Sequence, residues 1–353
     1  MLSNRQVNYD LLRIIAMLSV MTLHTATATW GNVTRETNWF IINSYVTISH
    51  WGVPVFVMIS GIIFLNPKKQ ISVKEIYIKY IKRILIAYIL WSALYSIYNI
   101  LTYGGNLITF ITSTFSGHFH LWYLVMLIGL YMITPILRVF TRNLDEEVFK
   151  YWILLGWVFV VLIPLMRNIP IVNTILDINV KNINLSFLGG YVFYYIMGYY
   201  INNYDINKNI RKQIYILTIL VSIFCIYINN FSVFNFDKRI YLLGPFDLGT
   251  ALISISMLLL AKYNFNKFIL NEKIKYLIIK ISKYSFTMYL VHDFVNMFFY
   301  KMGFINTLFN PILSIPLISL CVFIVSLFIS FLMNKMLNYI RIKILMFRGF
   351  IYE

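Results

Sequence analysis

The stretch Ile312–Met333 reads ILSIPLISLCVFIVSLFISFLM and contains no charged side chain. A helix over this stretch is long enough to cross the ~30 Å hydrocarbon core of a bilayer. Comparable apolar runs recur along the whole chain, separated by loops of roughly 20 residues or fewer. We therefore predict about ten transmembrane helices by this length criterion, at Leu11–Thr29, Tyr45–Leu65, Ile84–Tyr103, Phe119–Leu137, Tyr151–Met166, Phe187–Asn202, Gln213–Asn230, Tyr241–Ala261, Tyr284–Gly303 and Ile312–Met333.

The composition supports the same fold class. Hydrophobic residues make up 60% of the 353 residues, charged residues only 12%, and the mean hydropathy is +0.74. A soluble domain cannot cover that much apolar side chain with a polar surface. Backbone groups in lipid must pair internally, and a β-barrel would show shorter alternating segments. We predict an all-α, polytopic integral membrane helical bundle, with one transmembrane domain over residues 1–353 and no separate soluble domain.

The positive charges predict the orientation of the bundle. With the N-terminus inside, 24 of the 30 Lys and Arg residues fall on cytoplasmic segments. Such a bias places both termini in the cytoplasm. The formal net charge of +17 is therefore attributed to topology and anionic lipid headgroups, and no nucleic-acid partner is expected. The resulting localisation is a multi-pass protein of the cell membrane.

The first predicted span admits a second interpretation. Ala26-Thr27-Ala28 follows an apolar run and imitates a signal-peptidase site. Cleavage there is disfavoured because the run carries Arg13 and His24, and because its removal would place the Lys-rich loops outside. We retain the first span as a transmembrane helix.

The two cysteines predict no covalent or metal framework. Cys225 and Cys321 both lie in apolar runs, far apart, without His or Cys neighbours at ligand spacing. Neither a disulfide nor a metal site is expected.

Polar residues at membrane depth are the informative ones, because they cost free energy there and tend to mark function. Asp10 and Arg13 are three residues apart and can pair on one helix face. Taken alone, such an ion pair at the membrane interface contributes little to stability. His24 follows on the same face, about 16 Å further along the axis. The aligned arginine and histidine favour a polar cavity over simple packing.

Further candidates lie in four later segments. Ser60 and Gly61 are two small residues near the inner end of the second span, where small residues allow close helix packing. Ser60 has no general base beside it in the sequence, so it is not assigned as a nucleophile. A cluster of basic residues lies at the start of the third span and includes Lys79, Lys82 and Arg83. These residues can determine the membrane topology, or they can bind a phosphorylated ligand by ionic contact. Aromatic residues after His120 serve as belt anchors or as platforms for a sugar; they are Trp122 and Tyr123.

His292 lies about 12 Å inside the ninth span by helical rise. A histidine at this depth needs a partner or a wet cavity. The neighbouring Asp293 points about 100° away on a helix, so the two are not an obvious dyad. Asp247 is a further buried carboxylate candidate in the eighth span.

Six short motifs occur in order along nearly the whole chain: Asp10-Leu11-Leu12-Arg13 followed by His24, Val53–Gly61 (VPVFVMISG), Lys82–Tyr88 (KRILIAY), His120–Leu124 (HLWYL), Phe193–Tyr200 (FYYIMGYY) and Ser285–His292 (SFTMYLVH). Each is weak alone. In their order, spacing and number of spans they resemble membrane-bound acyltransferase family 3. Members of that family include O-acetyltransferases of bacterial surface polysaccharides and peptidoglycan.

The resemblance implies an enzyme that uses cytosolic acyl-coenzyme A, most often acetyl-CoA, as donor and an extracytoplasmic hydroxyl as acceptor. Arg13 and His24 match the family's arginine and histidine, and His24 is the residue expected to be essential for acyl transfer. Of the family's two arginines at the start of the third helix, the second matches Arg83. The first falls on Tyr80, which leaves Lys79 and Lys82 as substitutes.

From these positions we assign roles as hypotheses. His24 would act as general base, supported by Arg13 and Asp10. The donor phosphates would meet the basic cluster of the third span. The candidate residues for the substrate are Ser60, His120, Trp122, Tyr123 and His292. The sequence does not reveal the group that stabilises the oxyanion.

Two other classes of function are also compatible with the sequence. A transporter or flippase of a lipid-linked sugar would use the buried His and Asp residues as a pathway or proton relay. The absence of a detectable inverted repeat counts mildly against it. A sensor on the same scaffold would not need to retain Arg13, His24 and Arg83. The acceptor, the acyl group and the oligomeric state are not encoded in any recognisable motif.

Overall fold

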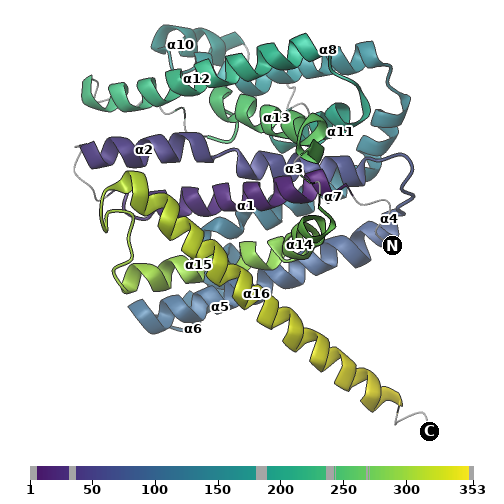
Figure 1. The fold of residues 1–353 in the computed structure, drawn as a ribbon, viewed down its shortest axis with the longest axis vertical. Helices are drawn as coiled ribbons and strands as arrows, with labels where there is room; N and C mark the ends of the chain where they lie inside the picture. The colour runs from purple at the N-terminus through teal and green to yellow at the C-terminus, as the bar shows by residue number, and fades with distance from the viewer. Residues whose placement is uncertain are drawn as a thin grey trace. The chain divides into compact units, whose positions relative to one another are not determined.

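A computed structural model describes residues 6–31, 37–179, 189–235, 242, 244–267, 269 and 271–349, and these contain helices and no β-strand (Figure 1). The protein is a polytopic helical membrane protein, as predicted. Its helices are α1 Val7–Thr27, α2 Thr37–Ser49, α3 Gly52–Phe64, α4 Val73–Glu75, η1 Ile76–Ile81, α5 Lys82–Tyr103, α6 Leu107–Ser116, η2 Phe119–Leu121, α7 Trp122–Asn143, α8 Glu146–Gly156, η3 Trp157–Leu162, α9 Ile163–Met166, α10 Pro170–Asn179, α11 Tyr191–Asn203, α12 Lys208–Asn235, α13 Leu248–Tyr263, η5 Phe265–Lys267, α14 Glu272–Ser282, α15 Ser285–Lys301 and α16 Pro311–Gly349.

Within the described residues, 7 helical segments are long and apolar enough to cross a membrane. The other three predicted spans are shorter helices: α11, α13 and α15 have 13, 16 and 17 residues. Phe187 and Tyr241, where the sixth and eighth spans were predicted to begin, lie outside the described residues. A helix packed among other helices does not need the full bilayer length, because protein can cover its ends.

The second predicted span, Tyr45–Leu65, lies almost entirely within the single candidate membrane segment Thr37–Phe64, and a short turn interrupts the helix inside it. The chain leaves the helix at His50 and Trp51, so that α2 ends at Ser49 and α3 begins at Gly52. Pro54 explains the break. In an uninterrupted helix its ring would clash with the carbonyl of His50 and would remove one hydrogen bond, whereas the first turn of a new helix tolerates proline.

Helix contacts divide the chain into two compact units, Met1–Val46 with Lys267–Glu353, and Thr47–Asn266. We call these the first and second unit. The prediction of one transmembrane domain over residues 1–353 stays a prediction.

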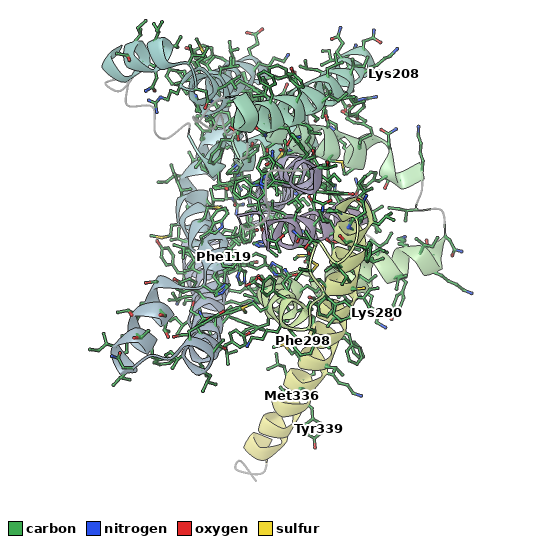
Figure 2. The ribbon with its side chains drawn as sticks, turned by 90° about the vertical axis from the view of Figure 1, so that its left-hand side faces the viewer. Phe119, Lys208, Lys280, Phe298, Met336 and Tyr339 are labelled. Atoms are coloured by element: carbon green, nitrogen blue, oxygen red, sulfur yellow. The ribbon has the colours of Figure 1, made fainter. Side chains whose placement is uncertain are left out.

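In the first unit, α1 packs against α14, α15 and α16, and α15 packs against α16. Polar side chains fix the ends of these helices: Asn306 donates to the carbonyl of Ala26 over 2.8 Å, and the Tyr45 hydroxyl donates to the carbonyl of Ile312 over 2.9 Å. The C-terminal part of α16 extends beyond α1, α14 and α15 (Figure 1). Met336 and Tyr339 lie on this extension and are exposed (Figure 2). The helix therefore continues well past Met333, where the tenth span was predicted to end.

The second unit is built around the close pairing of α3 and α11. Two glycines allow this approach. A Cβ added to Gly61 would lie 1.9 Å from the carbonyl oxygen of Tyr195, and one added to Gly198 would lie 2.1 Å from that of Met58. Small residues at a helix crossing let backbones come together, and close packing is the main driving force between helices in lipid.

Replacing either glycine by alanine should therefore destabilise the second unit. Because the added methyl group meets backbone rather than a flexible side chain, the helices must separate, at a cost of about 1–3 kcal/mol. Gly61→Ala and Gly198→Ala should each lower the thermal unfolding temperature of the detergent-solubilised protein.

The matched control is Gly129→Ala in α7, where an added Cβ meets nothing within 4 Å. This variant should keep or slightly raise stability through helix propensity. Equal unfolding temperatures for Gly61→Ala, Gly198→Ala and the wild type would contradict the packing argument.

Candidate functional site

The predicted pair of Asp10 and Arg13 is present on the first turns of α1. Arg13 Nη1 lies 3.0 Å from Asp10 Oδ1. The Asp10 carboxylate is buried, and it also accepts a hydrogen bond of 2.9 Å from the Ser282 hydroxyl at the end of α14. The pair is therefore more than an exposed interfacial contact, because it joins two helices through a buried carboxylate.

His24 lies near the other end of α1 and meets His292 of α15. Their ring centroids are 5.0 Å apart in an edge-to-face arrangement. His292 is fully buried, and its Nδ1 donates a hydrogen bond of 2.6 Å to the carbonyl of Tyr289. A carbonyl oxygen only accepts, so the Nδ1 of His292 carries a proton, and in the neutral ring Nε2 is the nitrogen with the lone pair.

The two histidines were separate candidates in the sequence, His24 as catalytic base and His292 as a substrate residue. The structure brings them into ring contact within the first unit. Asp10, Arg13, His24 and His292 thus all belong to one unit, and α1 carries three of them.

The second unit holds a separate aromatic and histidine cluster. His118 and His120 flank Phe119 in η2, and their Nδ1 atoms are 3.0 Å apart. Tyr95 of α5 stacks on His118 with centroids 4.1 Å apart and meets His120 edge-on at 5.1 Å. This cluster contains the predicted residue His120, but Tyr95 and the role of His118 were not predicted.

The two aromatic residues after His120 differ in exposure. Trp122 is 45% exposed and lies 5.6 Å from the Tyr191 ring, whereas Tyr123 is 9% exposed and packs against Phe56. The indole of Trp122 is therefore the more accessible surface.

The predicted basic residues lie on the surface of the second unit. Lys79, in the π-helical turn η1, pairs with Glu75 at 3.0 Å. Lys82 and Arg83 are the first residues of α5, and both are exposed. The π-helical turn immediately before them shifts the helix register, a feature often found at functional sites.

Ser60 is held within its own helix. Its hydroxyl donates to the carbonyl of Phe56 over 2.9 Å. Asp247, predicted inside the eighth span, instead directly precedes α13 as its N-cap residue and accepts a hydrogen bond from the Gly244 N–H. It therefore lies at a helix terminus rather than at the centre of a span.

Ser282 and Tyr95 gave no signal in the sequence. Ser282 follows a lysine-rich segment and meets Asp10 from 272 positions away. Tyr95 is one of 27 tyrosines in the chain. Their roles depend on contacts between distant segments, which a motif search cannot detect.

A family model described as an acyltransferase domain matches residues 6–335. The chain belongs to membrane-bound acyltransferase family 3. Neither the comparison with curated proteins nor the comparison with solved structures gives a match. Family membership and the apolar helices together make this protein an acyltransferase and a multi-pass membrane protein.

In this acyltransferase, Ser282→Ala should weaken the attachment of α14 to α1. The substitution removes a hydrogen bond to a buried carboxylate, a kind of bond worth about 1.5–3 kcal/mol. The free energy of unfolding in detergent should fall by that order.

Ser285→Ala is the matched control, since the Ser285 hydroxyl donates only to the neutral carbonyl of Ser282 in the contacts observed. Its effect should be smaller. In an Asp10→Asn background the effect of Ser282→Ala should shrink, as a double-mutant cycle would measure. A loss for Ser282→Ala no larger than that for Ser285→Ala would show that the Asp10 contact contributes nothing.

Proposed function

We propose that this protein is an O-acyltransferase of the bacterial plasma membrane. It moves an acyl group, most often acetyl, from cytosolic acyl-CoA to a hydroxyl group of an extracytoplasmic glycan or other cell-envelope acceptor. His24 is the general base of this reaction. Acetyl-CoA is a co-substrate, and neither a metal nor a nucleic acid takes part.

The contact between His24 and His292 is the observation that carries this proposal. A histidine has an ordinary pKa near neutrality, so it can accept and return a proton at physiological pH. Ionisable residues at membrane depth are costly, and two of them in ring contact mark a functional site by default. The hydrogen bond to Tyr289 fixes the tautomer of His292, which supports a role in orienting His24.

In this reaction, His24 is the group that accepts and returns the proton. His24 takes the proton from the acceptor hydroxyl as its oxygen attacks the thioester carbonyl. The carbon–sulfur bond then breaks, the ester forms, and the protonated imidazole returns the proton to the coenzyme A thiolate. The products are the O-acyl ester and free coenzyme A.

Arg13 supports this role from the same helix. Its guanidinium is fixed by the buried Asp10 carboxylate, which in turn is held by Ser282. A fixed arginine near the predicted cytosolic end of α1 can bind a phosphate group by charge-assisted hydrogen bonds.

The second unit carries groups suited to the donor and the acceptor. Lys79, Lys82 and Arg83 are exposed cations on a segment predicted to be cytosolic, where the phosphates of acyl-CoA arrive. The accessible ring of Trp122 is a platform for the apolar face of a sugar, with His120 and Tyr123 beside it in the sequence. Ser60 takes a lesser part in this proposal, because its hydroxyl is bonded within its own helix.

Family membership favours acyl transfer over the transport of a lipid-linked sugar. A transporter would move its substrate without requiring acyl-CoA. The two functions therefore differ in whether coenzyme A is released in proportion to product.

His24→Ala should reduce acyl transfer by about 100-fold or more, because general base catalysis typically contributes that much. The measurement follows labelled acetyl groups from acetyl-CoA into envelope glycans in membrane vesicles, together with released coenzyme A. O-acyl groups on glycans purified from cells with the wild type, the variant or no protein give the matching result in vivo.

Thr27→Ala serves as the control on the same helix. Thr27 is exposed, and its hydroxyl donates to the carbonyl oxygens of Leu23 and His24 one turn back. This variant should transfer acetyl groups normally, and both variants should insert into the membrane at wild-type levels. Normal acetylation by His24→Ala would rule out His24 as the base.

A further inference from the structure

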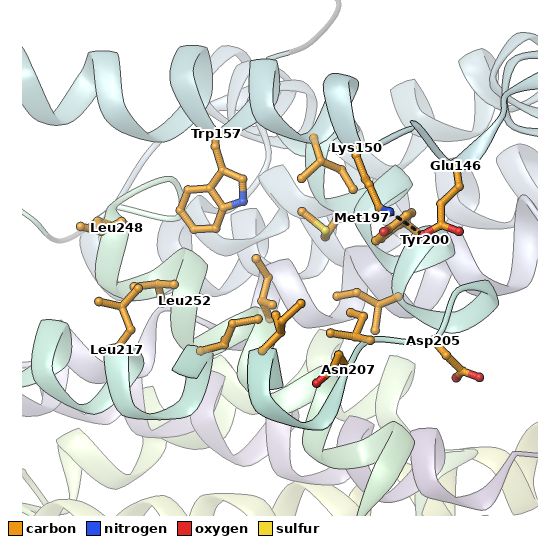
Figure 3. Close-up of a pocket in the computed structure, with 16 residues that line it drawn as sticks. Glu146, Lys150, Trp157, Met197, Tyr200, Asp205, Asn207, Leu217, Leu248 and Leu252 are labelled. Carbon is orange, nitrogen blue, oxygen red and sulfur yellow. Dashed lines mark ion pairs between the residues drawn. The ribbon is translucent and has the colours of Figure 1, made fainter. Parts of the chain in front are cut away.

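A pocket of about 670 Å³ lies within the second unit (Figure 3). One wall is formed by α8 and η3, the other by α12, and the base by α11 and α13. Its interior is apolar and includes Trp157, Met197, Leu217 and Leu252. The charged lining residues Glu146, Lys150 and Asp205 lie together at one end of the pocket (Figure 3). The pocket therefore suits an amphipathic ligand with a long apolar part.

The loop at the charged end is held in place by hydrogen bonds. Lys262 Nζ donates to the carbonyl oxygens of Ile201 and Tyr204, each over 2.8 Å, and lies 3.3 Å from Asp205. The Tyr263 hydroxyl accepts a hydrogen bond of 2.8 Å from the Ile206 N–H. These contacts cap the end of α11 and fix the start of α12. The pocket is thus preformed at its opening.

The length of the pocket matches one leaflet of a bilayer. Its lining runs along α12 from Asn207 to Leu217, which is about 15 Å at 1.5 Å per residue. One leaflet contributes half of a ~30 Å hydrocarbon core. Only 11% of the apolar window of α12 is buried, so this wall of the pocket faces outward. A lipid chain can enter from the side.

The charges at the opening indicate the headgroup. Two ion pairs lie there: Lys150 is 2.9 Å from Glu146, and Lys262 is 3.3 Å from Asp205. The hydrogen bond and the positive charge of Lys262 lower the pKa of Asp205 below its ordinary value. A headgroup with both a phosphate and an ammonium group complements this set, since Lys150 can bind the phosphate while Glu146 or Asp205 binds the amine. A purely anionic headgroup could only take the place of a carboxylate beside a lysine, and it would leave that carboxylate without its partner.

We propose that this pocket binds an acyl chain of a zwitterionic, amine-bearing phospholipid, phosphatidylethanolamine, from the leaflet next to Lys208 and Lys212. The positive-inside bias predicts that leaflet to be the cytoplasmic one. The lipid supports the largely exposed helix α12 and fills the space between α12 and α8. The site is independent of His24 and of the acyl-transfer chemistry.

The experiment places the purified full-length protein in nanodiscs with equal amounts of phosphatidylethanolamine and phosphatidylglycerol. Detergent then removes lipid stepwise, and native mass spectrometry counts what stays bound. The wild type should retain one phosphatidylethanolamine after the other lipids are lost. Leu252→Trp and Leu217→Trp, which fill the pocket, should lose it.

Leu217 is 48% exposed, so Leu217→Trp disturbs no core even if Leu252→Trp fails to fold. The matched control is Leu220→Trp on the same helix, where the side chain is exposed and does not line the pocket. It should retain the lipid. Glu146→Gln combined with Asp205→Asn should abolish the preference for phosphatidylethanolamine, because it removes both carboxylates.

Retention of the lipid by Leu217→Trp at the wild-type level would overturn the proposal. Equal retention of the two phospholipids by the wild type would also overturn it, and would identify the bound molecules as ordinary annular lipid. His24→Ala should retain the lipid at the wild-type level even though it loses acyl transfer. The two experiments therefore test the lipid site and the proposed function independently.

Discussion

In the hydrocarbon core of a bilayer, a backbone N–H or carbonyl group that leaves its helix finds no water to bond with. Each such group costs several kcal/mol, so the chain stays helical wherever lipid surrounds it. The π-helical turn Trp157–Leu162, within the predicted span Tyr151–Met166, respects this constraint. It keeps the backbone hydrogen-bonded through longer-range pairs while changing the direction of the side chains that follow. The break between α2 and α3 falls where Pro54 prevents an uninterrupted helix.

The same constraint governs how the helices associate. Lipid tails are as apolar as the side chains that they contact, so helices gain little by hiding apolar surface from lipid. Close contact must hold them together instead. Gly61 and Gly198 remove the Cβ atoms that would separate α3 from α11. Nine residues of α11 are buried, many of them aromatic, and their rings fill the space around this crossing. In contrast, α12 packs on α13 but leaves most of its apolar surface exposed, and the pocket lies beside it.

The candidate site residues Asp10, His24 and His120 each contact another polar or aromatic side chain. Asp10 is bonded to both Arg13 and Ser282, His24 contacts His292, and His118 contacts His120 and Tyr95. Each contact offsets the cost of placing a polar group where water is scarce, and each also fixes the geometry of one helix against another.

The sequence by itself determined the helical spans, because apolar length and loop charge are local properties of the chain. It also determined the family, through motifs whose order is preserved, and the pairing of Asp10 with Arg13, which depends only on helical spacing. The sequence also contained Pro54, the cause of the break between α2 and α3, although the length of the apolar run alone favoured one helix.

Only the tertiary structure decided which distant residues meet. His24 and His292 lie on helices from opposite ends of the chain, and Ser282 reaches Asp10 across 272 positions. The pocket between α8 and α12 likewise depends on how four helices pack. These features follow from side-chain packing summed over many weak contacts, and no short stretch of sequence encodes such a sum.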